Sequence, residues 1–84
     1  MTIKVRLFAA LRELAGSSEV DATGRTAGEL VDQLSERYGE RFAKIAAVGS
    51  IVVNGDRADR TTPVAEGDQV ALLPPVSGGA PQRD

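Results

Sequence analysis

The chain begins with the alternating stretch Ile3-Lys4-Val5-Arg6-Leu7-Phe8, in which apolar side chains occupy every second position up to Leu7. A period of two is typical of a strand with one buried face, because successive side chains of a strand point to opposite sides of the sheet. Phe8 falls on the polar side of this alternation. The pattern therefore predicts a strand over residues 2–8 that ends in an aromatic side chain facing away from the core.

A helical turn and a second strand are predicted next. Residues 9–16 are rich in helix formers and end at Gly16, the residue type that most often follows a helix. Residues 18–23 predict a weaker strand. Together with the first strand it would form a hairpin that is widened by the helical turn.

One long helix is predicted after the hairpin. Thr26 and Glu29 form a capping-box pair, in which each side chain satisfies a backbone N–H group that is free at the start of a helix. Gly39 is placed where the helix should end. An apolar stripe at helical spacing indicates the buried face, and it consists of Ala27, Leu30, Val31, Leu34 and Tyr38. A shorter apolar-rich piece over residues 41–48 is compatible with further helix.

The remaining residues predict three more strands. Residues 50–53 form the third, Asn54-Gly55 is a strong signal for a two-residue hairpin, and a short fourth strand is expected around Arg57. Residues 69–73 form the last. This order predicts an α+β fold with a mixed sheet of about four to five strands and one long helix on one face. If the first and last strands are parallel, both finish at one edge, and Leu73 faces outward beside Phe8.

Size and composition limit the functions open to the chain. Its 84 residues suffice for one domain and include no Cys and no His, which excludes thiolate nucleophiles, imidazole chemistry and Cys/His metal sites. A formal net charge of −2 and few aromatic residues argue against nucleic-acid binding. No signal peptide or long apolar run is present, so we expect a cytoplasmic protein that does not bind membranes.

The segment after the last strand carries the functional signal. Pro74-Pro75 directs the chain away from the sheet in an extended conformation, and Gly78-Gly79 follows after Val76 and Ser77. Two glycines can be inserted as bare backbone into a narrow cleft, although such a pair also occurs in flexible ends. We therefore expect one domain over residues 1–77 and a short mobile tail over residues 78–84.

Three segments together resemble the MoaD family, the small sulfur-carrier subunits of molybdopterin synthase within the MoaD/ThiS ubiquitin-like superfamily. They are residues 3–16, the turn Val53-Asn54-Gly55 and residues 67–79. Related ThiS carriers also end in Gly-Gly but usually lack the segment Arg12-Glu13-Leu14 and the Pro-Pro-Val-Ser approach. The resemblance implies a β-grasp, ubiquitin-like fold, which is consistent with the predicted order of elements.

The resemblance also implies a mechanism in which the chain is not an enzyme on its own. A MoeB-like activating enzyme adenylates the carboxylate of Gly79 with ATP, and the adenylate is converted into a thiocarboxylate. The chain then inserts its tail into a MoaE-like large subunit, which uses the sulfur to build the dithiolene of molybdopterin. Catalytic acids and bases reside on the partners, and no cofactor is bound by the chain itself.

Particular residues acquire roles from this resemblance. Gly79 would carry the sulfur, and the expected partner contacts are Phe8, Arg12, Leu73, Pro74, Pro75, Val76, Ser77 and Gly78. Structural alternatives remain for three of them. Phe8 can pack on the following helical turn, Leu73 can be buried if the strand register shifts, and Arg12 can be a solvated side chain.

The sequence departs from the family pattern after Gly79, because Ala80-Pro81-Gln82-Arg83-Asp84 follows it. The carbonyl group of Gly79 is therefore in a peptide bond and cannot be adenylated as it stands. We expect a metallopeptidase of the JAMM type to cleave after Gly79. The alternatives are that the five residues are not physiological or that this copy carries no sulfur.

Other functions stay open at this point. A sulfur carrier could serve the thiamine, cysteine or a specialised-metabolite pathway instead. A ubiquitin-like modifier would join Gly79 to lysines of target proteins, and a β-grasp binding module would have no C-terminal chemistry.

Overall fold

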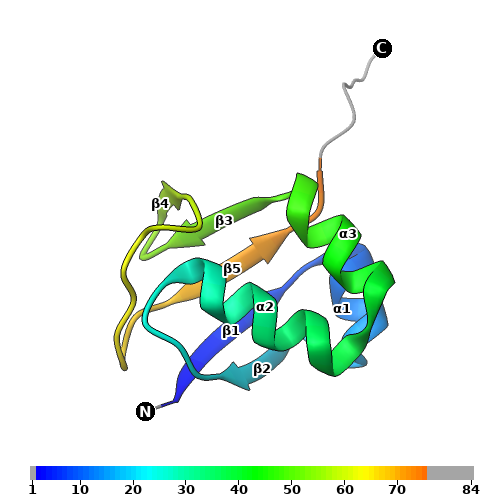
Figure 1. Ribbon diagram of the computed structural model, residues 1–84, viewed down its shortest axis with the longest axis horizontal. Coiled ribbons are helices and arrows are strands. Elements are labelled where there is room, and N and C mark those ends of the chain that lie inside the picture. Colours follow the sequence, from blue (N-terminus) through cyan, green and yellow to red (C-terminus); the bar gives the residue numbers. More distant parts are fainter. Residues whose placement is uncertain (1, 76–84) are drawn as a thin grey trace.

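The computed structural model describes residues 2–75, which form one mixed sheet with helices on one of its faces (Figure 1). The strands lie in the order β2-β1-β5-β3-β4. Their bounds are β1 (Ile3–Leu7), β2 (Glu19–Ala22), β3 (Ser50–Val53), β4 (Asp56–Ala58) and β5 (Val70–Leu73). The helices are α1 (Ala9–Ala15), α2 (Ala27–Tyr38) and α3 (Glu40–Val48). This arrangement confirms the predicted α+β class and the β-grasp order of strands.

The first strand organises the sheet, because β1 pairs with β2 in antiparallel and with β5 in parallel orientation. Val5 lies opposite Val20 on one side and Val70 on the other. The side chains of β1 alternate between buried and exposed as the sequence predicts. The parallel pairing of the first and last strands is thereby confirmed.

The start of α2 follows the predicted cap with one difference. The Thr26 hydroxyl accepts a hydrogen bond from the backbone N–H of Glu29 at 3.3 Å. The Glu29 carboxylate, however, accepts from the backbone N–H of Arg25 at 2.7 Å, one residue earlier than a capping box requires. Two free backbone donors are satisfied in this way, so the helix begins where it was expected.

The long helix predicted to end before Gly39 is confirmed as α2, but the expectation of a single helix on the sheet is not exact, because α3 covers the same face as α2 (Figure 1). Gly39 separates them with a φ of 102°, a left-handed value that interrupts the helical path. Phe42 on α3 is fully buried, and its ring centroid lies 5.4 Å from that of Tyr38. The aromatic pair joins the two helices and completes the core.

One hydrophobic core fills the space between the helices and the sheet. Burying each large apolar side chain stabilises the fold by about 1.5–3 kcal/mol. Its largest fully buried members are Ile3, Val5, Leu7, Leu11, Leu30, Leu34, Phe42, Val70 and Leu72. They include the inward residues of β1 and two residues of the predicted stripe of α2, Leu30 and Leu34, whereas Tyr38 is only partly buried.

The hairpin predicted at Asn54-Gly55 is confirmed, with φ values of 54° and 85° at the two residues. Asn54 also ties this turn to the start of β5. Its backbone N–H donates to the carbonyl oxygen of Gln69 at 2.7 Å, and its side-chain oxygen accepts from the N–H of Gln69 at 2.9 Å. Its amide nitrogen donates to the Asp68 carboxylate at 3.1 Å. The turn is thus part of the sheet as well as a connection.

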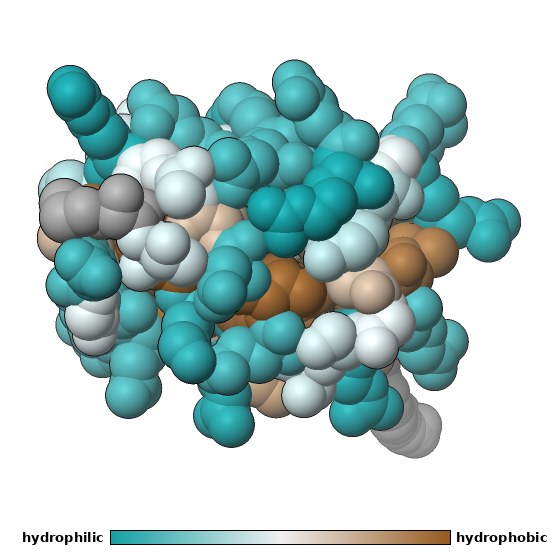
Figure 2. All heavy atoms as spheres, turned by 90° about the horizontal axis from the view of Figure 1, so that it is seen from below, coloured by the Kyte–Doolittle hydropathy of each residue, from teal (hydrophilic) through white to brown (hydrophobic). Residues whose placement is uncertain are grey.

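The edge strand β2 carries the exposed acidic residues Glu19 and Asp21. Figure 2 shows the molecule from the side on which β2 lies, and this side is mainly hydrophilic with a few small hydrophobic areas. Charged side chains of this kind discourage an edge strand from pairing with another chain. None of the helices within residues 2–75 is long and apolar enough to span a membrane. The predicted domain boundary after residue 77 lies outside the described residues.

Candidate partner-docking site

The parallel pairing of β1 and β5 brings two predicted contact residues to one edge of the sheet. Leu7 and Leu72 are register partners, so Phe8 and Leu73 follow them at the same end. Phe8 is 43% exposed. The exposure predicted for this aromatic side chain is confirmed, while its contact with a partner stays a prediction.

A tight turn fixes the position of Phe8. Phe8 itself is extended, whereas Ala9 has a φ of 52°, a left-handed value that costs a non-glycine residue about 1–2 kcal/mol. The N–H of Leu11 donates to the carbonyl oxygen of Phe8 at 3.2 Å, and the Leu11 side chain is fully buried. The chain therefore turns into α1 immediately after Phe8 and leaves the aromatic ring at the surface.

Leu73 faces the open side of the sheet as predicted, but it is half-buried, so the expectation that this leucine is fully exposed is not met. The physical reason is the place of β5 within the sheet, between β1 and β3. Leu73 has Ser50 as its register partner on β3, and neighbouring strands on both sides cover part of its surface. Pro74 is also half-buried and Pro75 is exposed, which leaves an apolar surface that begins at Phe8 and follows the chain out of β5.

The end of α3 belongs to the same edge, a feature that the sequence analysis missed. Gly49 follows α3 directly, and a Cβ atom on it would collide with the carbonyl oxygen of Leu73. Val48, the preceding residue, is 67% exposed. An apolar residue before a glycine at a helix end is a weak signal, and only the packing of α3 on β5 shows that it matters.

The remaining predicted residues are not all placed. Arg12 lies on α1 one turn after Phe8 and is exposed, and it takes part in no ion pair among residues 2–75. Val76, Ser77, Gly78 and Gly79, together with residues 80–84, lie outside the described residues. The candidate docking edge, a name used for residues at this end of the sheet, therefore consists of Phe8, Val48, Gly49, Leu73, Pro74 and Pro75.

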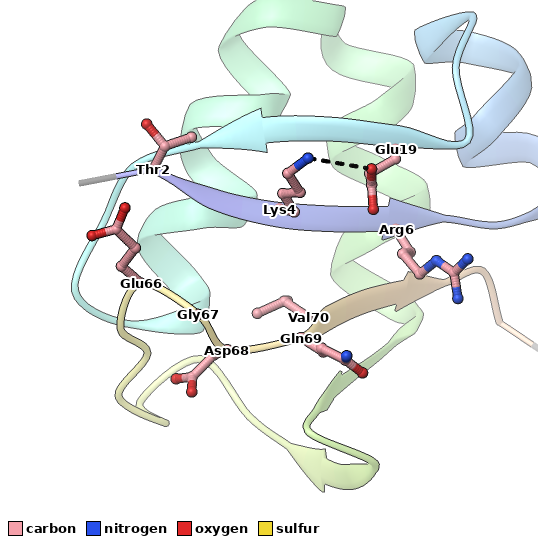
Figure 3. Close-up of a pocket in the computed structure, with 9 residues that line it drawn as sticks. All are labelled: Thr2, Lys4, Arg6, Glu19, Glu66, Gly67, Asp68, Gln69 and Val70. Carbon is pink, nitrogen blue, oxygen red and sulfur yellow. Dashed lines mark ion pairs between the residues drawn. The ribbon is translucent and has the colours of Figure 1, made fainter.

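A hollow of about 570 Å³ occupies the open face of the sheet, opposite the helices (Figure 3). Lys4 and Arg6 extend from β1 along one wall, and Lys4 Nζ lies 3.9 Å from the Glu19 carboxylate. Glu66 and Asp68 lie at the other end of it. The mixture of exposed charges of both signs favours a contact surface over a reaction site.

The titration of Asp59 is perturbed for a structural reason. The Thr61 hydroxyl and backbone N–H donate to its carboxylate at 2.6 and 2.8 Å, and these hydrogen bonds lower the pKa of Asp59 below its usual value of 3.8. The turn then continues to Thr62, whose carbonyl oxygen accepts from the N–H of Ala27 at 2.9 Å. Asp59 thus holds the loop that packs on the start of α2.

Comparison with known proteins places this geometry among small carrier proteins. The model of the ThiS family matches residues 5–79. The molybdopterin synthase sulfur carrier subunit of Escherichia coli is 38% identical over 85 residues, with 92% of this chain and 99% of the relative covered. The subunit of the same name from Mycobacterium tuberculosis is 35% identical over 81 residues, which cover 92% of this chain and 96% of the relative. Small archaeal modifier protein 1 of Haloferax volcanii is 36% identical over 88 residues, covering 88% and 97%.

Solved structures agree with this fold. The crystal structure of SAMP1 from Haloferax volcanii superposes with a TM-score of 0.75 at 32% identity and covers 94% of this chain and all of that one, 100%. A complex of subunits 1 and 2 of the molybdopterin-converting factor of Helicobacter pylori contains a chain with a TM-score of 0.67 and 30% identity, covering 94% and 100%. A chain in the BexX/CysO complex of Amycolatopsis orientalis has a TM-score of 0.75 and 25% identity, covering 92% and 99%. Two of these similar chains were solved together with a second protein, and the subunits named above are sulfur carriers, as expected for a chain that is not an enzyme on its own.

Proposed function

The chain belongs to the ThiS family of sulfur carriers, and from this premise we propose that it is the small, sulfur-carrying subunit of a molybdopterin synthase. The observation that carries the proposal is the family match, which runs through Gly78 and ends at Gly79. The relatives named as sulfur carrier subunits of that enzyme, at 35% and 38% identity, support the pathway.

In the proposed reaction, the carboxylate of Gly79 attacks the α-phosphate of ATP on a MoeB-like enzyme, and pyrophosphate leaves. A sulfide nucleophile then attacks the carbonyl carbon of the acyl-adenylate, AMP leaves with the electron pair of the broken bond, and a thiocarboxylate remains. Glycine offers no side chain to obstruct this attack. ATP is thus consumed by the partner, and the chain needs no cofactor of its own.

Sulfur transfer follows on the second partner. The thiocarboxylate sulfur becomes the nucleophile with which a MoaE-like large subunit builds the dithiolene, and general acids and bases are supplied by that subunit. In this proposal Phe8, Leu73, Pro74 and Pro75 contact the larger protein, with Arg12 at the rim. Val76, Ser77 and Gly78 line the inserted tail. The cytoplasm remains the predicted location.

Cleavage after Gly79 is a necessary part of the proposal, because Ala80 blocks the carboxylate. A metallopeptidase of the JAMM type would hydrolyse this peptide bond with water, which leaves the carboxylate on Gly79 and a free amine on Ala80. The end of the family match at Gly79 supports this position of cleavage.

The test is a reconstitution with a chain that ends at Gly79. It is incubated with ATP, a sulfide donor and the MoeB-like enzyme of the same host, and intact mass spectrometry measures the exchange of oxygen for sulfur. The large subunit and the pterin precursor are then added, and molybdopterin is assayed. The full-length chain is the matched control, since it must form no thiocarboxylate until the tail is removed. A thiocarboxylate without molybdopterin would reassign the chain to another sulfur pathway, and the lack of a thiocarboxylate would refute the carrier function.

Protein modification is the second candidate, because the similarity to small archaeal modifier protein 1 extends over 88% of this chain. Higher-mass conjugates in the host, lost when Gly78 and Gly79 are deleted, would support that function. Their absence alongside a thiocarboxylate form would leave sulfur transfer as the function.

A further inference from the structure

The strand β2 lies at one edge of the sheet, and its pairing with β1 shows which of its backbone groups point outward. The N–H of Leu7 donates to the carbonyl oxygen of Ser18 at 2.9 Å, so these two residues form a hydrogen-bonded pair. Bonded and non-bonded pairs alternate along antiparallel strands. Glu19 and Asp21 therefore direct their backbone N–H and C=O groups away from β1, and Thr23 does the same directly after the strand.

The first outward residue of β2 is bound by a serine two positions before it. The Ser17 hydroxyl donates to the carbonyl oxygen of Glu19 at 2.8 Å. The same hydroxyl oxygen accepts from the backbone N–H of Glu19 at 3.3 Å. One side chain thus occupies both backbone groups that Glu19 would otherwise offer to an added strand.

Helix α2 supplies the other contacts to this edge. A guanidinium nitrogen of Arg37, in the last turn of α2, donates to the carbonyl oxygen of Asp21 at 2.9 Å. The side-chain oxygen of Gln33 accepts from the backbone N–H of Thr23 at 2.7 Å, and its amide nitrogen donates to the Thr23 hydroxyl at 2.8 Å. Gln33 and Arg37 are one helical turn apart, so they lie on the same side of α2. That side of the helix therefore covers the backbone of the edge strand.

These three side chains, Ser17, Gln33 and Arg37, form a group that we call the edge cap. Among the outward groups of β2, it leaves only the N–H of Asp21 without a partner within residues 2–75. A strand cannot add to an edge whose donors and acceptors are already bound unless those hydrogen bonds first break.

The opposite edge strand, β4, is protected in a different way. The turn between β3 and β4 has two residues, so Val53 and Asp56 form the bonded pair that closes it. Arg57 is therefore the one residue of β4 whose backbone points outward, and the strand has only three residues. A very short edge strand offers little to a partner, whereas β2 would present several groups if it were not capped.

We propose that the edge cap closes β2 to strand addition and so prevents the chain from pairing with a second copy of itself. A second copy is the relevant partner, because it always presents the same strand with the same backbone groups. Two β2 strands related by a two-fold axis would pair in antiparallel orientation, with Asp21 opposite its counterpart. Repulsion between these carboxylates adds to the effect of the cap. The inference is independent of the proposed function, since it involves neither sulfur chemistry nor a larger partner.

Hydrogen exchange of the wild-type chain tests the cap without any substitution. The amide hydrogens of Glu19 and Thr23 should exchange at least about tenfold more slowly than that of Asp21, after correction for the intrinsic rate of each residue. Gln33→Ala should remove the protection of Thr23 only, and Ser17→Ala that of Glu19 only. Equal corrected rates at the three amides of the wild-type chain would refute the cap.

Analytical ultracentrifugation tests the exclusion of a second copy. The cap variant combines Ser17→Ala, Gln33→Ala and Arg37→Ala. Its matched control combines Ser18→Ala with Arg41→Ala, at exposed side chains that form no hydrogen bond to β2 within residues 2–75. We expect the cap variant to dimerise with a Kd at least about tenfold lower than that of wild type or control, because each freed backbone group can form an intermolecular hydrogen bond. Circular dichroism checks that all the chains are folded.

The outcomes of the two measurements decide the inference. A dimer of the cap variant in which amide exchange slows at Glu19 and Asp21 would establish pairing through β2. A folded cap variant that remains as monomeric as the control overturns the inference, and so does a dimer without protection in β2. If the cap variant does not fold, Arg37→Ala alone takes its place, since it frees the carbonyl group of Asp21 beside the N–H that is already free. Self-association of Arg37→Ala no stronger than that of Arg41→Ala then counts against the cap.

Discussion

Gly49 and Leu73 are in direct backbone contact, because a Cβ atom on Gly49 would collide with the carbonyl oxygen of Leu73. Gly49 joins α3 to β3, and Leu73 is the last residue of β5. The place where the chain leaves the sheet is thus defined by the end of a helix as well as by strand pairing. Any partner that receives the following residues meets this junction.

Replacing Gly49 by alanine should destabilise the protein by roughly 1–3 kcal/mol, the range for overpacking a tight contact. Its φ is −87°, which alanine adopts freely, so the loss would come from the collision and not from the backbone conformation. Chemical denaturation measures this loss of stability. Gly16→Ala is the comparison, since that site has a φ of 77° and open space around it. Faster amide exchange at Leu73 is expected only for Gly49→Ala, and wild-type stability of that variant would contradict the contact.

Replacing Phe8 by alanine should weaken binding of the larger partner by more than about tenfold, with little change in stability, because aromatic residues dominate many interfaces and this side chain is 43% exposed. Titration calorimetry and thermal unfolding measure the two effects. Val48→Ala, at a side chain that is 67% exposed, shows whether the apolar contact extends onto α3. A large loss of stability with unchanged binding would instead assign Phe8 to packing on α1.

The carboxylate of Asp59 should make the stability of the protein depend on pH. Its pKa is lowered in the folded state, chiefly by the hydrogen bond from the Thr61 hydroxyl, so the unfolded chain takes up the proton more readily. The contribution of Asp59 to the free energy of unfolding is fully present at pH values above its usual pKa of 3.8. It is lost as the pH falls through the lower pKa of the folded state. Asp59→Asn should therefore be less stable than wild type at neutral pH, with a difference that shrinks under strongly acidic conditions. Asp56→Asn controls for the loss of a nearby charge, and a difference that is constant with pH would refute the assignment.

Asn54 is expected to stabilise the sheet through its side chain as well as through its turn. Asn54→Gly keeps the positive φ accessible and the backbone hydrogen bond to Gln69, but it removes the side-chain hydrogen bonds to Gln69 and Asp68, which should cost about 1–2 kcal/mol. Asn54→Ala should cost more, since alanine also resists a φ of 54°. Urea denaturation of both variants separates the two contributions. Equal stability of Asn54→Gly and wild type would show that the side-chain bonds are unimportant.

Much of the candidate site was visible in the sequence. The alternation in β1 predicted that Phe8 would lie outside the core, and the placement of the last strand brought Leu73 to the same edge. The exposure of Leu73 was overestimated because coverage depends on both neighbouring strands. The contact of Gly49 was missed because it joins residues 24 positions apart, counted from 49 to 73, without a local pattern to mark it.

The sequence by itself determined the local elements, because each depends on neighbours only a few positions away. The period of two in β1, the Thr26 cap of α2 and the positive φ values at Asn54-Gly55 are of this kind. It also determined the class of protein through the C-terminal glycines and the run of matching residues.

Only the tertiary structure decided which of these elements meet. Arg6 and Arg57 lie on one row because β5 and β3 stand between β1 and β4 in a fixed register, and no pattern along the chain contains that register. The packing of α3 on the sheet likewise brought Gly49 against Leu73. Contacts between distant segments depend on how the whole core packs, and the core forms only when all the elements are present.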